Sequence, residues 1–290
     1  MTRRFLQPEL ARLPKPQLIE EISADRLIGE IKAYVQARWD EVRAERPDLP
    51  ALDTLGLETE PLTVLIEAFA YRETLLRALI NDKARAVLLA LASGSDLDHI
   101  GALVGVERAV VAPATNDTPV IMETDDRLRR RIQLAPEAFS VAGPAGAYEF
   151  HALSLDPSIL DAYAYSPREG EVHVIVIGQN VEPVSDDVMT RLVRKFKLGD
   201  VAPLTDSVTV RRAQPVPFGL EAQAIVSSGA DTAAVRSSFE TAMRDYIATR
   251  ARIGAPVYLS GIIASAKAAD TENLVIKQPA GDVLCAPYPI

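Results

Sequence analysis

Residues 123–155 read ETDDRLRRRIQLAPEAFSVAGPAGAYEFHALSL, and this stretch decides the fold. Thr124 or Asp125 can cap a helix that starts near Asp126, because a side-chain oxygen accepts a hydrogen bond from a free N–H of the first turn. A break and a second helix follow in the pattern. We therefore expect a helical region before this stretch and a strand-rich region after it.

The break between the two expected helices lies at Gly143, Pro144 and Gly146. Glycine permits positive φ, whereas proline fixes its own φ and removes a backbone donor. Helical spacing therefore stops at these residues and resumes after them. The sequence predicts a hinge at Gly143, Pro144 and Gly146.

The first of these helices carries four arginines, mostly away from its apolar face: Arg127, Arg129, Arg130 and Arg131. They predict a basic ridge on an acidic protein. No aromatic residue lies between them, so a stacking groove for single-stranded nucleic acid is not indicated. We expect the ridge to form salt bridges with an acidic partner surface, or with Glu137 and Glu149.

The composition is that of a globular chain with two or three domains, with 48% hydrophobic and 24% charged residues in a length of 290. The formal net charge of −9 argues against a general grip on nucleic acid phosphates. No apolar run has the length of a membrane span, so none is expected. The single cysteine excludes an internal disulfide framework and fits assembly in a reducing cytoplasm.

The N-terminal part is expected to be an extended arm followed by helices. Three prolines in residues 1–18 suppress helix formation there. A first amphipathic helix starts after Ser23, a favourable N-cap, and stops before Pro47. The next helix is predicted over residues 61–92, with proline at its first position and a glycine just past its end.

The long helix of residues 61–92 has an apolar stripe at heptad spacing. Its candidate assembly residues are Leu62, Ile66, Phe69, Leu76 and Ile80. Glu73 and Lys83 interrupt the stripe, which favours a bundle helix that packs on other helices or chains over a free-standing coiled coil. A second interpretation stays open: the stripe could be the core of a monomeric helical domain.

After residue 155 the hydrophobic period changes from helical to alternating. Strands are predicted at 159–165, 171–177, 207–212, 217–227, 273–278 and 282–285, the last two as a pair, and helices at 185–198, 231–249 and 257–267. The repeated order predicts two small ferredoxin-like α/β sandwich units, and hence an α+β fold. The expected division is an extended arm (1–18), a helical domain (19–122) and two α/β domains (123–212 and 213–290).

The polar residues do not form a recognisable catalytic or metal-binding pattern. His99, His151 and His173 lie far apart and match no ligand spacing. The aspartate pairs at 125–126 and 186–187 sit at predicted helix starts, where capping explains them. We therefore expect no catalytic residue, no cofactor and no metal, and a protein that is not an enzyme.

Three stretches resemble the phage baseplate assembly protein J family, the wedge protein of contractile tails and tailocins. They are RRRIQLAPEAFSVAGPAGAYEFHAL, SPREGEVHVIVIG and the upstream EAFAYRETLLRALINDKARAVLLALASGSDLDHIGALVGVER. The resemblance runs from about residue 57 to residue 178, and the order of elements agrees to the C-terminus.

The resemblance implies a structural wedge subunit in the baseplate of a virion or tailocin, assembled in the bacterial cytoplasm. Two copies are expected to join one baseplate I family wedge protein through a shared helical bundle. The C-terminal α/β domains are expected to link neighbouring wedges into a ring around the hub, in contact with other baseplate proteins. The alternative is a tail-associated cell-envelope hydrolase, which requires a pocket with converging carboxylates or a histidine.

Overall fold

The computed structural model describes residues 10–14, 16, 23–140, 143–197, 201–203, 205–226, 231–268 and 271–285. Within these residues the chain divides into two compact units, one up to Ile100 and one from Gly101 onward. Most of the expected N-terminal arm lies outside the described residues. The expected four-part division of the chain stays a prediction.

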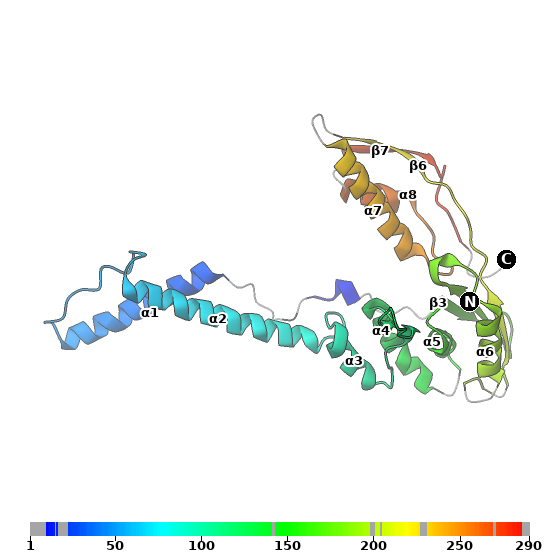
Figure 1. Cartoon of the computed structure of the whole chain (residues 1–290), viewed down its shortest axis with the longest axis horizontal. Helices are drawn as coiled ribbons and strands as arrows, with labels where there is room; N and C mark the ends of the chain where they lie inside the picture. Colours follow the sequence, from blue (N-terminus) through cyan, green and yellow to red (C-terminus); the bar gives the residue numbers. More distant parts are fainter. Residues whose placement is uncertain are drawn as a thin grey trace. The chain divides into compact units, whose positions relative to one another are not determined.

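The first unit consists mainly of two helices that lie side by side, α1 (Ala24–Glu45) and α2 (Pro61–Ala86) (Figure 1). The start of α1 agrees with the sequence: the Ser23 hydroxyl accepts a hydrogen bond from the N–H of Arg26 at 3.3 Å. Pro61 stands at the start of α2, where its missing N–H costs no helical hydrogen bond.

Helix α2 ends at Ala86, six residues before the predicted end. The N–H groups of Leu91 and Ala92 both donate to the carbonyl of Leu88, over 2.9 and 2.7 Å, and the resulting turn buries Ala92. Residues 87–92 contain neither glycine nor proline, so the sequence has no stop signal there. The prediction was wrong because Gly94, expected just past α2, is the first residue of α3 (Gly94–Ala102).

The second unit begins with a small antiparallel pair and then alternates helices with strands. In order its elements are β1 (Val110–Ala112), β2 (Ile121–Met122), α4 (Asp125–Leu134), a 3₁₀ turn (Ala135–Phe139), α5 (Ala145–Leu155), β3 (Ile159–Tyr165), β4 (Glu171–Gly178), a 3₁₀ turn (Gln179–Val181), α6 (Asp186–Lys197), β5 (Ser207–Arg212), β6 (Glu221–Ile225), α7 (Thr232–Arg250), α8 (Leu259–Ala268) and β7 (Asn273–Gln278).

The larger sheet has the strand order β3-β4-β5. Strands β3 and β4 are antiparallel, with Tyr165 opposite His173. Strands β4 and β5 are parallel, with Glu171 opposite Ser207, and α6 supplies the crossover that a parallel pair requires. This order leaves β3 and β5 at the two edges of the sheet.

Both faces of the β3–β4 hairpin are buried. On one face, Ala162, Ala164, Val174 and Val176 belong to the main hydrophobic core, together with residues of α5 and α6. On the other face, side chains from β3, β4 and the segment after α7 form a second cluster: Tyr163, Ile175, Ile177 and Ile253. Because both faces of β4 are buried, its sequence is a continuous apolar run. A strand with one exposed face would instead alternate apolar and polar residues.

The C-terminal part of this unit packs α7 and α8 against the β6–β7 pair, around Met243 and Ile262. Strand β7 pairs with β6 and not with residues 282–285, so the predicted final pair of strands was wrong. The N–H of Val283 instead donates to the carbonyl of Val257 at 2.9 Å. The chain after β7 therefore does not fold back on that strand as a hairpin.

The α+β fold class is confirmed, with a helical N-terminal part followed by small sheet units. In the described part of the chain, the two later sheets contain three and two strands. Neither sheet therefore shows the full βαββαβ set that a ferredoxin-like unit contains.

Candidate assembly surface

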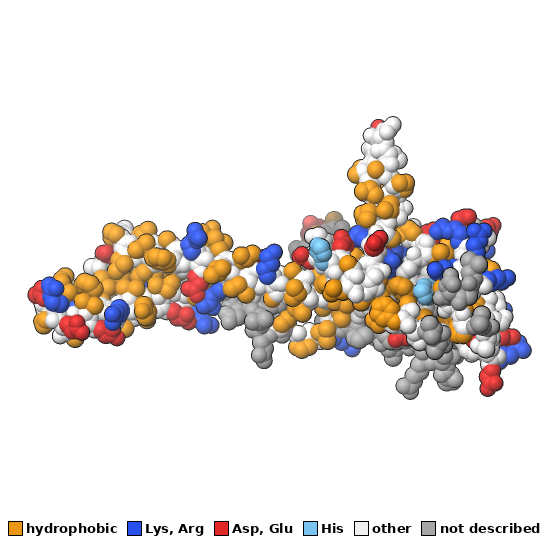
Figure 2. All heavy atoms as spheres, turned by 90° about the horizontal axis from the view of Figure 1, so that it is seen from below, with side chains coloured by type: hydrophobic (Ala, Val, Ile, Leu, Met, Phe, Trp, Pro, Cys, Tyr) orange, Lys and Arg blue, Asp and Glu red, His pale blue; other side chains and the backbone are white. Residues whose placement is uncertain are grey.

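Most of the large apolar side chains of α2 are exposed and are not covered by the rest of the chain. Phe69, Leu76 and Ile80 are 60, 57 and 49% exposed, and the neighbouring Leu65 and Leu79 are 51 and 52% exposed. We call these five residues the outward stripe. Figure 2 shows apolar side chains gathered over the part formed by α1 and α2. Such clustering is uncommon on an isolated soluble protein and marks contact surfaces.

The opposite face of α2 is buried but contains mostly small or polar residues. Thr63, Ile66, Ala70 and Asn81 are its buried members. Thr63 donates from its hydroxyl to the carbonyl of Leu55 at 3.1 Å, which satisfies that buried polar group. The contacts that α2 makes inside its own chain therefore leave most of its large apolar side chains uncovered.

The five predicted assembly residues thus fall into three groups. Phe69, Leu76 and Ile80 are exposed, Leu62 is half-buried and Ile66 is buried, 2% exposed. Leu65 and Leu79 widen the same apolar stripe, although they are not among the five candidates. Their spacing of four and three from Phe69 and Leu76 places them on the same side of the helix.

The predicted hinge residues lie in a closely packed turn before α5. Gly143 has φ +67°, and a Cβ there would lie 2.6 Å from Cδ of Pro203. A Cβ at Gly146 would lie 2.7 Å from Cγ of Glu137. Pro144 directly precedes α5, with φ −62° and ψ 152°. Local packing alone thus accounts for both glycines, and the hinge stays a prediction.

Two arginines of the predicted basic ridge enclose a buried carboxylate, that of Glu123. Arg127 and Arg131 both form ion pairs with Glu123, whose side chain is 0% exposed. Arg127 also donates to the carbonyls of Leu153 and Asp156, at 2.8 and 3.1 Å. Burial lowers the pKa of the Arg127 guanidinium, while Glu123 acts in the opposite direction. This cluster holds α4 against the C-terminal end of α5.

The other two arginines of the ridge also have partners in the chain. Arg130 pairs with the buried Asp161 of β3, and Arg129 pairs with the exposed Asp126 at 2.7 Å. In these four ion pairs of α4 the partners are Glu123, Asp126 and Asp161 rather than Glu137 or Glu149. The spacing of four and eight residues from Glu123 to Arg127 and Arg131 could have predicted that cluster.

The aspartates at predicted helix starts all take part in ion pairs. Asp125 and Asp126 pair with Arg108 and Arg129, and Asp186 and Asp187 pair with Arg212 and Arg191. Among the described residues, no three histidine, cysteine, aspartate or glutamate side chains form a metal-binding group. Within the same residues, no helix is long and apolar enough to cross a membrane.

Comparison with known sequences places these features in a family. Residues 58–115, which include α2 and its outward stripe, match the Baseplate J-like N-terminal domain. Residues 140–212, which include the β3-β4-β5 sheet, match the Baseplate J-like central domain. The chain belongs to the baseplate J family.

One curated relative is similar over nearly the whole chain. It is named Baseplate protein J, from Escherichia phage P2, and is 34% identical over 281 residues. The alignment covers 95% of this chain and 92% of the relative. The family resemblance of the sequence is therefore confirmed.

Proposed function

We propose that the protein is a structural subunit of the baseplate of a contractile phage tail or tailocin. The observation that carries this proposal is the outward stripe, an apolar surface that its own chain leaves uncovered. The similarity to a relative named as a baseplate protein supports the same assignment. The protein then acts by contact with other subunits in the virion or particle, after assembly in the bacterial cytoplasm, and not by catalysis.

The finer proposal is a wedge of two copies of this chain with one baseplate I family protein. The outward stripe packs in a helical bundle with those partners. Complete burial of a large apolar side chain stabilises a complex by about 1.5 to 3 kcal/mol, before ordering costs are subtracted. Several such side chains along one helix therefore contribute a large part of the free energy of association.

The α/β part is proposed to join neighbouring wedges into a ring around the hub. The sheet order leaves β3 and β5 at its edges, and an edge strand presents backbone groups that another chain can pair with. Gly143, Pro144 and Gly146 are proposed to adjust the angle between copies in unlike surroundings. Their crowded packing means that this adjustment has to move Pro203 and Glu137 as well.

The alternative of a cell-envelope hydrolase requires a cleft with converging acid and base groups. A cavity in the α/β part is lined mostly by apolar residues and by four arginines, with no acidic residue or histidine among its described lining. That lining does not match the requirement, so the structural assignment is favoured.

The experiment is co-expression of the full chain with the products of its neighbouring genes, followed by measurement of particle mass. Leu76→Glu or Phe69→Glu is expected to abolish entry into the complex, because a carboxylate cannot be buried in an apolar bundle without a partner. A folded Leu76→Glu protein that still enters the complex would overturn the proposed contact.

Leu103→Glu is the matched control for this experiment. Leu103 is 85% exposed but lies in the other compact unit, outside the outward stripe. The same apolar-to-acidic change should leave assembly intact there. If both variants fail alike, the loss reflects general solubility rather than a specific contact.

A further inference from the structure

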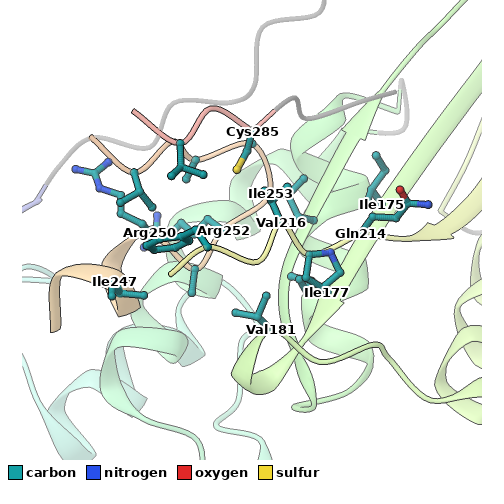
Figure 3. A pocket seen from close by; sticks show the side chains of 18 of the residues that line it. Ile175, Ile177, Val181, Gln214, Val216, Ile247, Arg250, Arg252, Ile253 and Cys285 are labelled. Carbon is teal, nitrogen blue, oxygen red and sulfur yellow. The ribbon is translucent and has the colours of Figure 1, made fainter. Parts of the chain in front are cut away.

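A cavity of about 540 Å³ lies between the larger sheet and the segment that follows α7 (Figure 3). Ile175 and Ile177 of β4 line it together with Ile253, and these three residues belong to the same hydrophobic cluster. Val216 and Phe218, between β5 and β6, complete an apolar wall. This volume lies within the usual range for a ligand-binding site.

The charge of the cavity is opposite to that of the chain. Four arginines line it, Arg211, Arg212, Arg250 and Arg252, and none of its described lining residues is acidic, although the whole chain has a net charge of −9. Arg212 is already bonded to the carbonyl of Val184 at 2.7 Å. Arg212 also pairs with Asp186, and Arg211 and Arg250 add positive charge beside the apolar wall.

Arg250 gives a more specific indication. Its Nε is buried, and no hydrogen-bond acceptor for this atom lies among the residues that the structure describes. A buried donor without an acceptor costs free energy, which an incoming carboxylate can recover. Arg250 is also a lining residue, so the cavity combines an apolar wall with an arginine that has a buried donor to satisfy.

The backbone around the cavity favours an extended segment over a small molecule. Residues 213–220 belong to no helix or strand, and five of them line the cavity. This stretch directly follows the edge strand β5, so a partner segment added along that edge can place its side chains in the pocket. We propose that this cavity receives an extended segment of a partner protein in which a large apolar side chain stands next to an aspartate or glutamate.

The test uses the full chain and short peptides, blocked at both ends, of alternating leucine and glutamate or of alternating leucine and lysine. Calorimetric titration is expected to show binding of the acidic peptide only. Arg250→Gln should weaken that binding about tenfold, the loss of one charged hydrogen bond. Val216→Glu, at an exposed lining residue, should abolish it by placing an anion in the cavity.

Arg236→Gln is the matched control, because Arg236 lies on the same helix as Arg250 but is 80% exposed and pairs with Glu240. It should leave the affinity unchanged. Equal binding of both peptides, equal loss in both arginine variants, or no binding at about 1 mM acidic peptide would overturn the proposal. The proposal would also fail if dodecanoate, an apolar chain with one carboxylate, binds while the peptides do not. It would fail as well if Val216→Glu acts only by dispersing a self-associated form of the chain.

Discussion

Oδ2 of Asp161 accepts a hydrogen bond from the backbone N–H of Ile253 at 2.8 Å, across 92 positions of sequence. The same carboxylate forms an ion pair with Arg130 and accepts the N–H of Ala162 at 2.9 Å. The Asp161 side chain is 0% exposed. One buried anion therefore connects α4, β3 and the segment after α7.

Asp161→Ala is expected to destabilise the protein by about 3 to 5 kcal/mol, because Arg130 would lose its buried anion. Denaturant unfolding checks this through a lower midpoint at an unchanged slope. Asp126→Ala is the control: Asp126 is 96% exposed, and loss of its pair with Arg129 should cost at most about 1 kcal/mol. Similar costs for both variants would contradict the role given to Asp161.

Two alanine variants of α2 distinguish a side chain that is buried within the isolated protein from one that only partners would bury. Ile66→Ala should destabilise the isolated protein by about 2 to 5 kcal/mol, because Ile66 is 2% exposed. Leu76→Ala, at a 57% exposed side chain, should change its stability by no more than about 0.5 kcal/mol. A large cost at Leu76 in the isolated chain would mean that its own chain already covers the outward stripe.

Gly143→Ala is predicted to destabilise the protein more than Gly105→Ala does. Both glycines have similar positive φ values, +67° and +70°. The added Cβ meets Pro203 at position 143 but meets no atom within 4 Å at position 105. Both variants carry the same backbone strain from a positive φ. The difference between their unfolding free energies therefore measures the crowding at Gly143. Equal losses would show that the turn relaxes easily, as the hinge proposal requires.

Stability should fall on mild acidification partly because of His151. Burial, and then Lys195, lower the pKa of His151. The unfolded chain therefore binds more protons than the folded chain as the pH falls below the ordinary histidine value of about 6.5, and stability is lost. His151→Gln should show a smaller loss of stability from about pH 7.5 to 5.5.

The exposed His99→Gln variant is the control for that pH series. Its loss of stability on acidification should follow that of the parent protein. A parent-like slope in His151→Gln would show that other groups cause the acid sensitivity.

The sequence predicted the α+β class, the start of α1 and the strands β3 to β5, because capping residues and hydrophobic period are local signals. It could not predict the end of α2, where backbone hydrogen bonds to Leu88 and the burial of Ala92 replace any local stop signal. The pairing of β7 with β6 is likewise non-local, since it joins strands on either side of α7 and α8.

The candidate surface was predictable in part. The apolar stripe on α2 followed from spacing, but which side its own chain covers depends on the packing of α1, which spacing alone does not fix. The arginines of α4 were noticed for their charge, and their partners were missed. Asp161 lies 31 positions from Arg130, so only the folded chain brings the two together.

The uncovered face of α2 also has a thermal consequence. Removal of apolar surface from water lowers the heat capacity, and its driving force fades on cooling. A particle joined through this face should therefore loosen in the cold room and re-form on warming, so purification near ambient temperature should preserve it best.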